Sequence, residues 1–297
     1  MMAQTHGKGI LGTVRRATLL PIRYGLSPER VVSRLQRMIA TMDRWDSQPT
    51  IPVTASLLER HPEVVRRLSG ADLAIHGYRH VSYTRLGAEE KRVDLESACR
   101  VFAGQGIPRI GFRAPYLQID DETLELLRRQ GFRYDSSRAT LALPATNPLA
   151  GETQRLIAAR YGGGVVTSSG RELGTPVEIP VSLPDDEVLI DGLGIRSPSG
   201  LWRAYEAMMG VALSSGSHLV LQVHPERFHF VESALDLLLD SAVDSGAWVA
   251  SLSSVAAWFV EHGAPTRWPR SSSFALSVTG DLDAVSIRDF ASRAWGV

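Results

Sequence analysis

The chain has 297 residues, of which 44% are hydrophobic and 22% charged, as is typical of a globular protein with an apolar core. Its formal net charge is zero, and no basic block indicates nucleic acid or an anionic membrane as a partner. The single cysteine, Cys99, excludes an internal disulfide framework. No apolar run reaches the roughly 20 residues of a membrane span, and the first residues lack a secretory signal's apolar core, so we expect a cytoplasmic protein.

Short β-rich runs alternate with helical patterns along the chain, which favours a parallel sheet with crossover helices. The first helical pattern covers residues 27–45. The predicted strands are residues 50–55, 73–78, 109–114, 133–137, 177–182, 218–224, 248–253 and 274–280. This number suits a small barrel, so we predict one α/β domain over residues 1–297, a barrel of seven to eight mostly parallel strands.

Residues 138–176 do not follow this alternation. A connection of that length usually forms a lid or a rim element, because short loops join most neighbouring elements. We therefore predict a rim insertion over residues 138–176.

Two histidines follow the second predicted strand in the sequence IHGYRH. His76 and His80 are four residues apart, and in a tight turn this spacing places both imidazoles on one side, where they can share a metal ion. The spacing alone also fits two unrelated surface histidines. Their position at a strand end favours a site, because parallel barrels carry catalytic groups there.

Two further motifs follow later strands. In GFRAPY, Arg113 can hold a carboxylate with two hydrogen bonds, and the Tyr116 N–H can face an oxyanion. In LQVHPERF, His224 follows an apolar strand and can act as a general acid near neutral pH. An ordinary turn with a surface arginine, and a structural histidine, are the alternatives that these motifs leave open.

The last predicted strand ends in SVTGDLDAV, which places Asp281 and Asp283 on either side of Leu282. Positions i and i+2 of an extended chain point to the same side, so one carboxylate could bind a cation while the other acts as a base. A polar turn before the final helix would give the same triplet. Four such signals at four strand ends together predict a hydrolytic site, since two histidines with one carboxylate can form a metal site with open positions for water and substrate.

In order and spacing, these motifs resemble the polysaccharide deacetylase family, whose shared domain is the NodB-homology domain. The likeness runs from about residue 27 to residue 226, and its motifs are H-x-x-x-H in IHGYRH, R-x-P-Y in GFRAPY and L-x-x-H-P in LQVHPE. The resemblance implies a distorted (β/α) barrel and a hydrolase that uses one divalent metal ion. Zinc is the first candidate for that ion, and cobalt, iron and nickel also suit imidazole ligands.

One family motif is absent from its expected place. An aspartate pair should end a strand just before the helix at residues 27–45, but TLLPIRYGLSPER contains no acid before Glu29. The C-terminal sequence FALSVTGDLDA supplies the pattern if the family's first strand has moved to the end of the chain, where a closed barrel can still accept it. We therefore expect residues 274–297 to provide the first motif of a circularly permuted NodB-like barrel.

The resemblance then implies a role for each residue. The metal ligands would be Asp283, His76 and His80. Asp281 would be the catalytic base, and Arg113 would orient it and restrain its pKa. The Tyr116 N–H would stabilise the oxyanion, and His224 would protonate the leaving amine.

Several alternatives stay open. The roles of Asp281 and Asp283 can be exchanged, and Asp185 or Asp186 could supply a carboxylate, although an acidic helix cap explains PDDE better. The implied substrate is a sugar or glycoconjugate with an N-acyl group, chiefly acetyl. A non-catalytic carbohydrate-binding domain and a hydrolase of small non-peptide C–N bonds are the competing hypotheses, and residues 138–176 would govern the substrate choice.

Overall fold

The computed structural model describes residues 20–161, 165–166, 176–263 and 268–295. Its strands are β1 (Thr50–Val53), β2 (Asp72–Ile75), β3 (Gly111–Phe112), β4 (Tyr134–Asp135), β5 (Ala139–Leu141), β6 (Val165–Val166), β7 (Val177–Glu178), β8 (Val181–Leu183), β9 (His218–Gln222), β10 (Ala247–Val249) and β11 (Phe274–Thr279). Its labelled α-helices are α2 (Glu29–Asp43), α3 (Ala55–Arg60), α4 (Pro62–Arg67), α5 (Ala88–Gly104), α6 (Asp121–Arg129), α7 (Ala150–Tyr161), α8 (Pro198–Ser215), α9 (Phe228–Asp244), α10 (Leu252–His262) and α11 (Ile287–Trp295).

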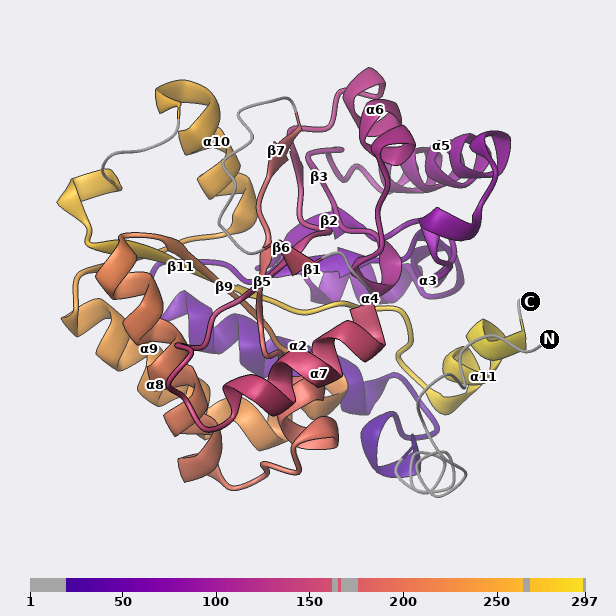
Figure 1. The fold of residues 1–297 in the computed structure, drawn as a ribbon. Helices are drawn as coiled ribbons and strands as arrows, with labels where there is room; N and C mark the ends of the chain where they lie inside the picture. Colours follow the sequence, from indigo (N-terminus) through magenta and orange to yellow (C-terminus); the bar gives the residue numbers. More distant parts are fainter. Residues whose placement is uncertain (1–19, 162–164, 167–175, 264–267, 296–297) are drawn as a thin grey trace.

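The strands form one parallel sheet that curls back on itself. Their order is β6-β5-β8-β9-β11-β1-β2-β3-β4-β7, and β10 pairs with β11 outside this path. β7 and β8 lie far apart in this order but are joined by only Ile179 and Pro180, so the series from β8 to β7 bends round to meet itself (Figure 1). The predicted distorted (β/α) barrel of mostly parallel strands is confirmed.

The strand predicted over residues 177–182 is two strands rather than one. β7 pairs with β4, whereas β8 pairs with β5 and β9. Pro180 stands between them and has no backbone N–H to donate to a ladder, which is the physical reason for the break. This division, together with β5 and β6, raises the strand count of the described sheet to 11, above the predicted seven to eight.

The C-terminal strand β11 lies inside the sheet, not at its edge. It pairs in parallel with β1 on one side and with β9 on the other, and all six of its residues are buried. Phe274, Leu276 and Val278 pack in the apolar core that the outer helices share. Ser277 and Thr279, which point the other way, carry the small polar side chains of the inner face.

The chain beyond β11 continues along β1. The N–H of Leu282 donates to the Pro52 carbonyl oxygen at 2.8 Å, and Leu282 accepts from the Thr54 N–H at 3.1 Å. A Cβ on Gly280 would collide with the carbonyl oxygen of Val223, so this close approach to β9 requires glycine. Leu282 is buried, and the aspartates on either side of it therefore point away from the apolar core, toward the carboxyl ends of β1 and β2.

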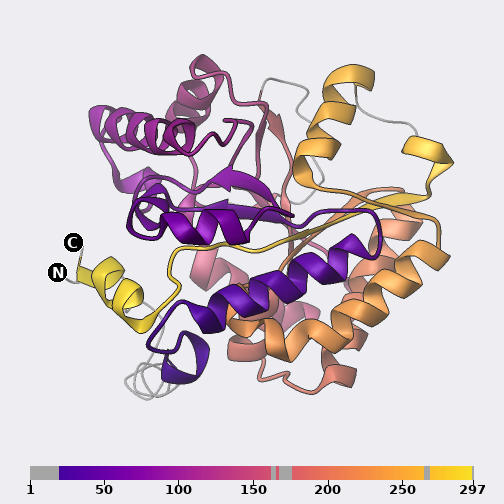
Figure 2. The same cartoon turned by 180° about the vertical axis from the view of Figure 1, so that it is seen from behind.

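Helices cover the outside of the sheet. α3 packs against α5, and α2 packs against α9, which in turn packs against α8; Figure 2 shows α2 running along the back of the molecule. Residues 138–176, predicted as a rim insertion, contain β5, α7 and β6, and residues 162–164 and 167–175 lie outside the described part. None of the helices in the described ranges combines the length and apolarity needed to cross a bilayer.

Candidate active site

The first histidine of the site is fixed in the form that binds metals. His76 follows β2 and has no exposed surface. Its Nδ1–H donates to the Arg113 carbonyl oxygen at 2.7 Å, while within the described chain its buried Nε2 has no hydrogen-bond partner. Burial lowers the pKa of His76, an effect that the charge of Asp281 opposes only in part, so the ring stays neutral with a lone pair on Nε2.

The second histidine and the two aspartates lie around that lone pair. The ring centroids of His76 and His80 are 5.1 Å apart. His80 Nε2 lies 3.3 Å from Asp283 Oδ2, and His76 Nε2 lies 3.8 Å from Asp281 Oδ2. Two ligand atoms on one tetrahedral zinc ion are about 3.3 Å apart, given metal–ligand bonds of about 2.0–2.2 Å. The spacing of His80 and Asp283 therefore suits a shared cation.

Asp281 is held as a carboxylate by two donors. Arg113 Nη1 donates to Oδ1 at 2.8 Å, and Gln222 Nε2 donates to Oδ2 at 2.9 Å. Burial alone would raise the pKa of Asp281, but the Arg113 charge, helped by that of His224 and by the Arg113 hydrogen bond, outweighs it and lowers that pKa. Asp281 is consequently ionised at neutral pH and oriented by its partners.

Arg113 is itself immobilised at the end of β3. Its guanidinium has no exposed surface and donates to Thr279 Oγ1 at 3.0 Å, to the Ser136 carbonyl oxygen at 3.0 Å and to Ser136 Oγ at 2.9 Å. Three strand ends, those of β3, β4 and β11, thus meet at this one side chain. A buried guanidinium with this set of acceptors presents a fixed charge to Asp281.

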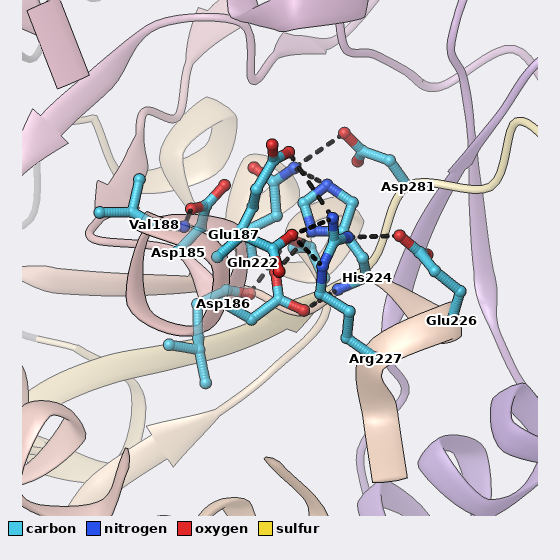
Figure 3. Close-up of polar contacts among 12 residues, drawn as sticks. Asp185, Asp186, Glu187, Val188, Gln222, His224, Glu226, Arg227 and Asp281 are labelled. Atoms are coloured by element: carbon cyan, nitrogen blue, oxygen red, sulfur yellow. Dashed lines mark hydrogen bonds and ion pairs between the residues drawn. The ribbon is translucent and has the colours of Figure 1, made fainter. Parts of the chain in front are cut away.

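His224 belongs to a second group, built on β8 and β9. Its Nδ1 lies 2.5 Å from Asp186 Oδ1, and its backbone N–H donates to Asp186 Oδ2 at 2.9 Å (Figure 3). Burial lowers the pKa of His224, but the charge of Asp186 and its hydrogen bond dominate and raise that pKa well above its usual value. His224 is therefore a protonated imidazole at neutral pH, as a general acid must be.

Gln222 connects the two groups. It is 3% exposed, and its Nε2 lies 2.9 Å from Asp281 Oδ2 and 3.4 Å from His224 Nε2. The Nε2 of His224 thus faces the carboxylate of Asp281 across one amide group (Figure 3). A candidate acid and a candidate base lie on opposite sides of Gln222.

Asp185 uses both of its oxygens in contacts with Tyr161 and Val188. It accepts from the Tyr161 hydroxyl at 2.7 Å and from the Val188 N–H at 2.8 Å, which is the acidic cap predicted for PDDE. Burial raises the pKa of Asp185 to about 6. Ligand atoms of Asp185, Asp186 and His224 all lie within 4.8 Å of one another, but the contacts above already engage the oxygens of both acids.

Tyr116 lies beside His80 in a strained backbone conformation. Its φ is 63°, in the left-handed region that side chains other than glycine rarely adopt, and Leu117 follows with φ 53°. The Tyr116 ring meets the His80 ring edge-on with centroids 4.4 Å apart. Strain of this kind is often found where a loop must aim a backbone or side-chain group at a site.

All seven residues predicted for the site are thus placed at neighbouring strand ends, while Asp185 and Asp186 join His224 instead of the histidine pair. The motifs did not reveal Gln222 or the partnership of Asp186 with His224. A signal for Gln222 was present, because a polar residue two positions before His224 in an apolar strand points to the same side. The Asp186 contact had no comparable signal, because it joins residues 38 positions apart.

The fold and these groups define a class of protein: a curled parallel α/β barrel that gathers histidines, carboxylates and an arginine at its strand ends. Residues 26–134 match the sequence model of the family described as polysaccharide deacetylase. This part of the chain contains IHGYRH and GFRAPY, and its match to the family model confirms the predicted resemblance to the polysaccharide deacetylase family.

Individual proteins are also similar to parts of this chain or share its fold. A peptidoglycan deacetylase-like protein of Gibberella zeae is 42% identical over 71 residues, which are 23% of this chain and 21% of that protein, so the match spans about a fifth of the relative's length. The crystal structure of a protein assigned as a polysaccharide deacetylase of Mycobacterium smegmatis has a TM-score of 0.60 at 23% identity, covering 88% of this chain and 87% of that one. The structure of Puue allantoinase has a TM-score of 0.52 at 19% identity, covering 78% of this chain and 74% of that one. At these identities the two structures show a shared fold.

Proposed function

We propose that this protein is a metal-dependent hydrolase that removes an acyl group, chiefly acetyl, from the amide nitrogen of a sugar or glycoconjugate. The observation that carries this proposal is the buried His76 Nε2, which has no hydrogen-bond partner in the described residues and lies with His80 beside two carboxylates. A buried polar atom without a partner is costly unless a ligand completes it. The polysaccharide deacetylase family supplies the reaction class.

The residues present fit a divalent cation. Asp283, His76 and His80 would hold it, and the Nδ1–H of His76 is tied to the Arg113 carbonyl oxygen, which is the usual way to fix a metal-binding imidazole. Bound there, such an ion would lower the pKa of a water molecule and polarise the acyl carbonyl. Zinc is the first candidate, and cobalt, iron and nickel suit the same ligands.

Asp281 is the proposed catalytic base. Both of its oxygens accept hydrogen bonds, from Arg113 and from Gln222, whereas Asp283 lies at ligand spacing from His80. Asp281 takes a proton from the attacking water, and the oxygen of that water forms a bond to the acyl carbon. Arg113 keeps Asp281 ionised before the proton transfer and holds its carboxylate in place during the transfer.

His224 is the proposed catalytic acid. It gives a proton to the amide nitrogen as the C–N bond breaks, so the products are a free amine and a carboxylate. Asp186 supports this role because it keeps His224 protonated. The Tyr116 N–H is proposed to donate to the oxyanion that forms on the acyl oxygen, and the positive φ at Tyr116 fixes its direction.

We also propose that residues 274–297 stand in for the first strand of the family's barrel. The support is the place of β11 between β9 and β1, with Asp281 and Asp283 directly after it. On this proposal the two acids missing before the helix at residues 27–45 are supplied from the other end of the sequence.

The central test combines metal analysis with the variant Asp283→Ala. Purified protein should contain about one divalent cation per chain, and Asp283→Ala should lose tight metal binding and the release of acetate from N-acetylglucosamine oligomers. The expected loss of activity is about 10³-fold or more, because three-ligand sites rarely retain a metal after losing a ligand. A variant that keeps its metal and full activity would overturn the assignment of Asp283.

Two alternatives give different results in the same assays. Hydrolysis of allantoin, a small cyclic amide, without acetate release from the oligomers would indicate a C–N hydrolase of the kind named for the allantoinase structure. Binding of the oligomers without turnover in the metal-loaded protein would indicate a carbohydrate-binding domain.

A further inference from the structure

The chain between the two histidines turns sharply before His80. Gly77 has a φ of 75°, and a Cβ at this position would approach the Arg79 carbonyl oxygen to 3.1 Å and Asp94 Oδ2 to 3.3 Å. The Gly77 and Tyr78 carbonyl oxygens accept from N–H groups of α3, at 3.0 and 2.9 Å. The carbonyl side of this turn is thus fixed by α3, and the N–H side needs a partner from elsewhere.

That partner is Asp94, a carboxylate in the middle of α5. Its Oδ2 accepts from the Tyr78 N–H at 2.7 Å and from the Tyr83 hydroxyl at 2.8 Å, and its Oδ1 accepts from the Arg79 N–H at 3.4 Å. The side chain is 2% exposed. Both oxygens of Asp94 therefore accept hydrogen bonds from the segment that leads from His76 to Tyr83.

We propose that Asp94 is a positioning residue for metal binding: it fixes the turn between His76 and His80 so that both imidazoles meet one cation. This inference rests on the metal site of the proposed function and extends it to a residue that touches neither the metal nor the substrate. Residues that orient metal ligands typically change metal affinity about 10- to 100-fold when they are altered.

The chemistry of the turn requires a carboxylate at residue 94. Three donors converge on it, and a carboxylate is acceptor-only on both oxygens. An asparagine would present an NH₂ group to one of these donors, either the Tyr78 N–H with the Tyr83 hydroxyl or the Arg79 N–H. The turn would then move to avoid two facing donors, and His80 would move with it.

The test measures zinc binding by titration calorimetry on chelator-stripped protein, with no substrate in the experiment. Asp94→Asn should weaken zinc binding by about 10- to 100-fold. Tyr83→Phe removes only the hydroxyl donor to the same carboxylate and leaves both backbone contacts, so it should weaken binding only a few-fold. Leu95→Ala, in the next position of α5 and fully buried, is the matched control, because it should lower the melting temperature while it removes none of the three hydrogen bonds to Asp94.

A wild-type zinc affinity in Asp94→Asn would overturn the inference, and so would an equal loss of affinity in Leu95→Ala at a similar drop in melting temperature. Amide hydrogen exchange in the metal-free protein supplies a second readout. Exchange at Tyr78 and Arg79 should accelerate in Asp94→Asn and stay unchanged in Leu95→Ala. If the wild-type chain binds no divalent cation, the proposed function fails, and the exchange data still decide whether Asp94 holds the turn.

Discussion

Two groups of histidine and aspartate residues meet at the strand ends, and they differ in the hydrogen bonds that their side chains make. The β2–β11 group consists of His76, His80, Asp281 and Asp283, and the β8–β9 group consists of Asp185, Asp186 and His224. Around β2 and β11, His76 Nε2 has no hydrogen bond within the described residues, and the nearest carboxylate oxygens lie 3.3 to 3.8 Å from the histidine nitrogens. Around β8 and β9, Asp186 lies 2.5 Å from His224 and Asp185 is bound by Tyr161 and Val188.

This difference is the reason for proposing the metal site in the β2–β11 group. The β8–β9 group is the tighter cluster of ligand atoms, but its donors and acceptors satisfy one another. The β2–β11 group contains the buried His76 Nε2, whose lone pair has no hydrogen-bond partner in the described residues and could be completed by a bound cation. The proposed metal site therefore rests on the unpartnered His76 Nε2 and not on the proximity of ligand types alone.

The largest loss of activity is expected from Asp281→Asn, which tests the proposed base in the β2–β11 group. An amide in place of the proposed base should lower kcat by about 10²- to 10⁴-fold, the usual contribution of a general base. Metal content should stay near that of the wild type, because Asp283 and the two histidines remain. Acetate release and metal analysis on the same sample provide the measurement. Loss of the metal in this variant would exchange the proposed roles of Asp281 and Asp283.

A smaller effect, dependent on pH, is expected from Asp186→Asn. The Asp186 charge raises the pKa of His224 against the effect of burial, so without that charge the pKa should fall. His224 is the proton donor only while protonated, and the alkaline limb of the kcat profile should therefore move to lower pH. At the alkaline end the loss should reach up to about 10²-fold, the contribution of a general acid.

NMR titration of the imidazole resonances in Asp186→Asn tests whether a lower pKa of His224 causes the shift of the alkaline limb. The His224 resonances should titrate at lower pH than in the wild type, while zinc affinity is retained. An unchanged pH profile together with a loss of zinc would place Asp186 in the metal site and remove the distinction between the two groups.

The sequence predicted what depends on local pattern. Parallel strands could be located from their apolar runs, and their carboxyl ends must share one edge, so His76, Arg113, His224 and Asp281 were expected near one another. The expectation that residues 274–297 supply the family's first motif rested on chain order alone, because an aspartate motif is missing before the helix at residues 27–45 and present after the last predicted strand. These inferences need only strand ends and chain order.

Contacts set by the approach of distant segments could not be predicted in this way. The break at Pro180 became evident only from the different partners of β7 and β8. Two such contacts are the Asp186–His224 pair and the hydrogen bonds from the turn before His80 to Asp94. Both depend on how one helix or strand packs against another, which residue spacing in the sequence does not give. For the same reason PDDE could be interpreted as a cap but not divided into one capping acid and one partner of histidine.

The smallest effect on metal binding is expected from Asp185→Asn, which tests directly whether the β8–β9 group binds a cation. Asp185 has the right chemistry for a metal ligand and lies within 4.8 Å of Asp186 and His224, but its oxygens accept from Tyr161 and Val188. The amide oxygen of asparagine can still accept from the Val188 N–H, so the cap should survive. We expect about one cation per chain in both proteins and the same zinc affinity by calorimetry. Two cations per wild-type chain, or a loss of one on this substitution, would show that the β8–β9 group opens to bind metal and that its internal hydrogen bonds do not exclude a cation.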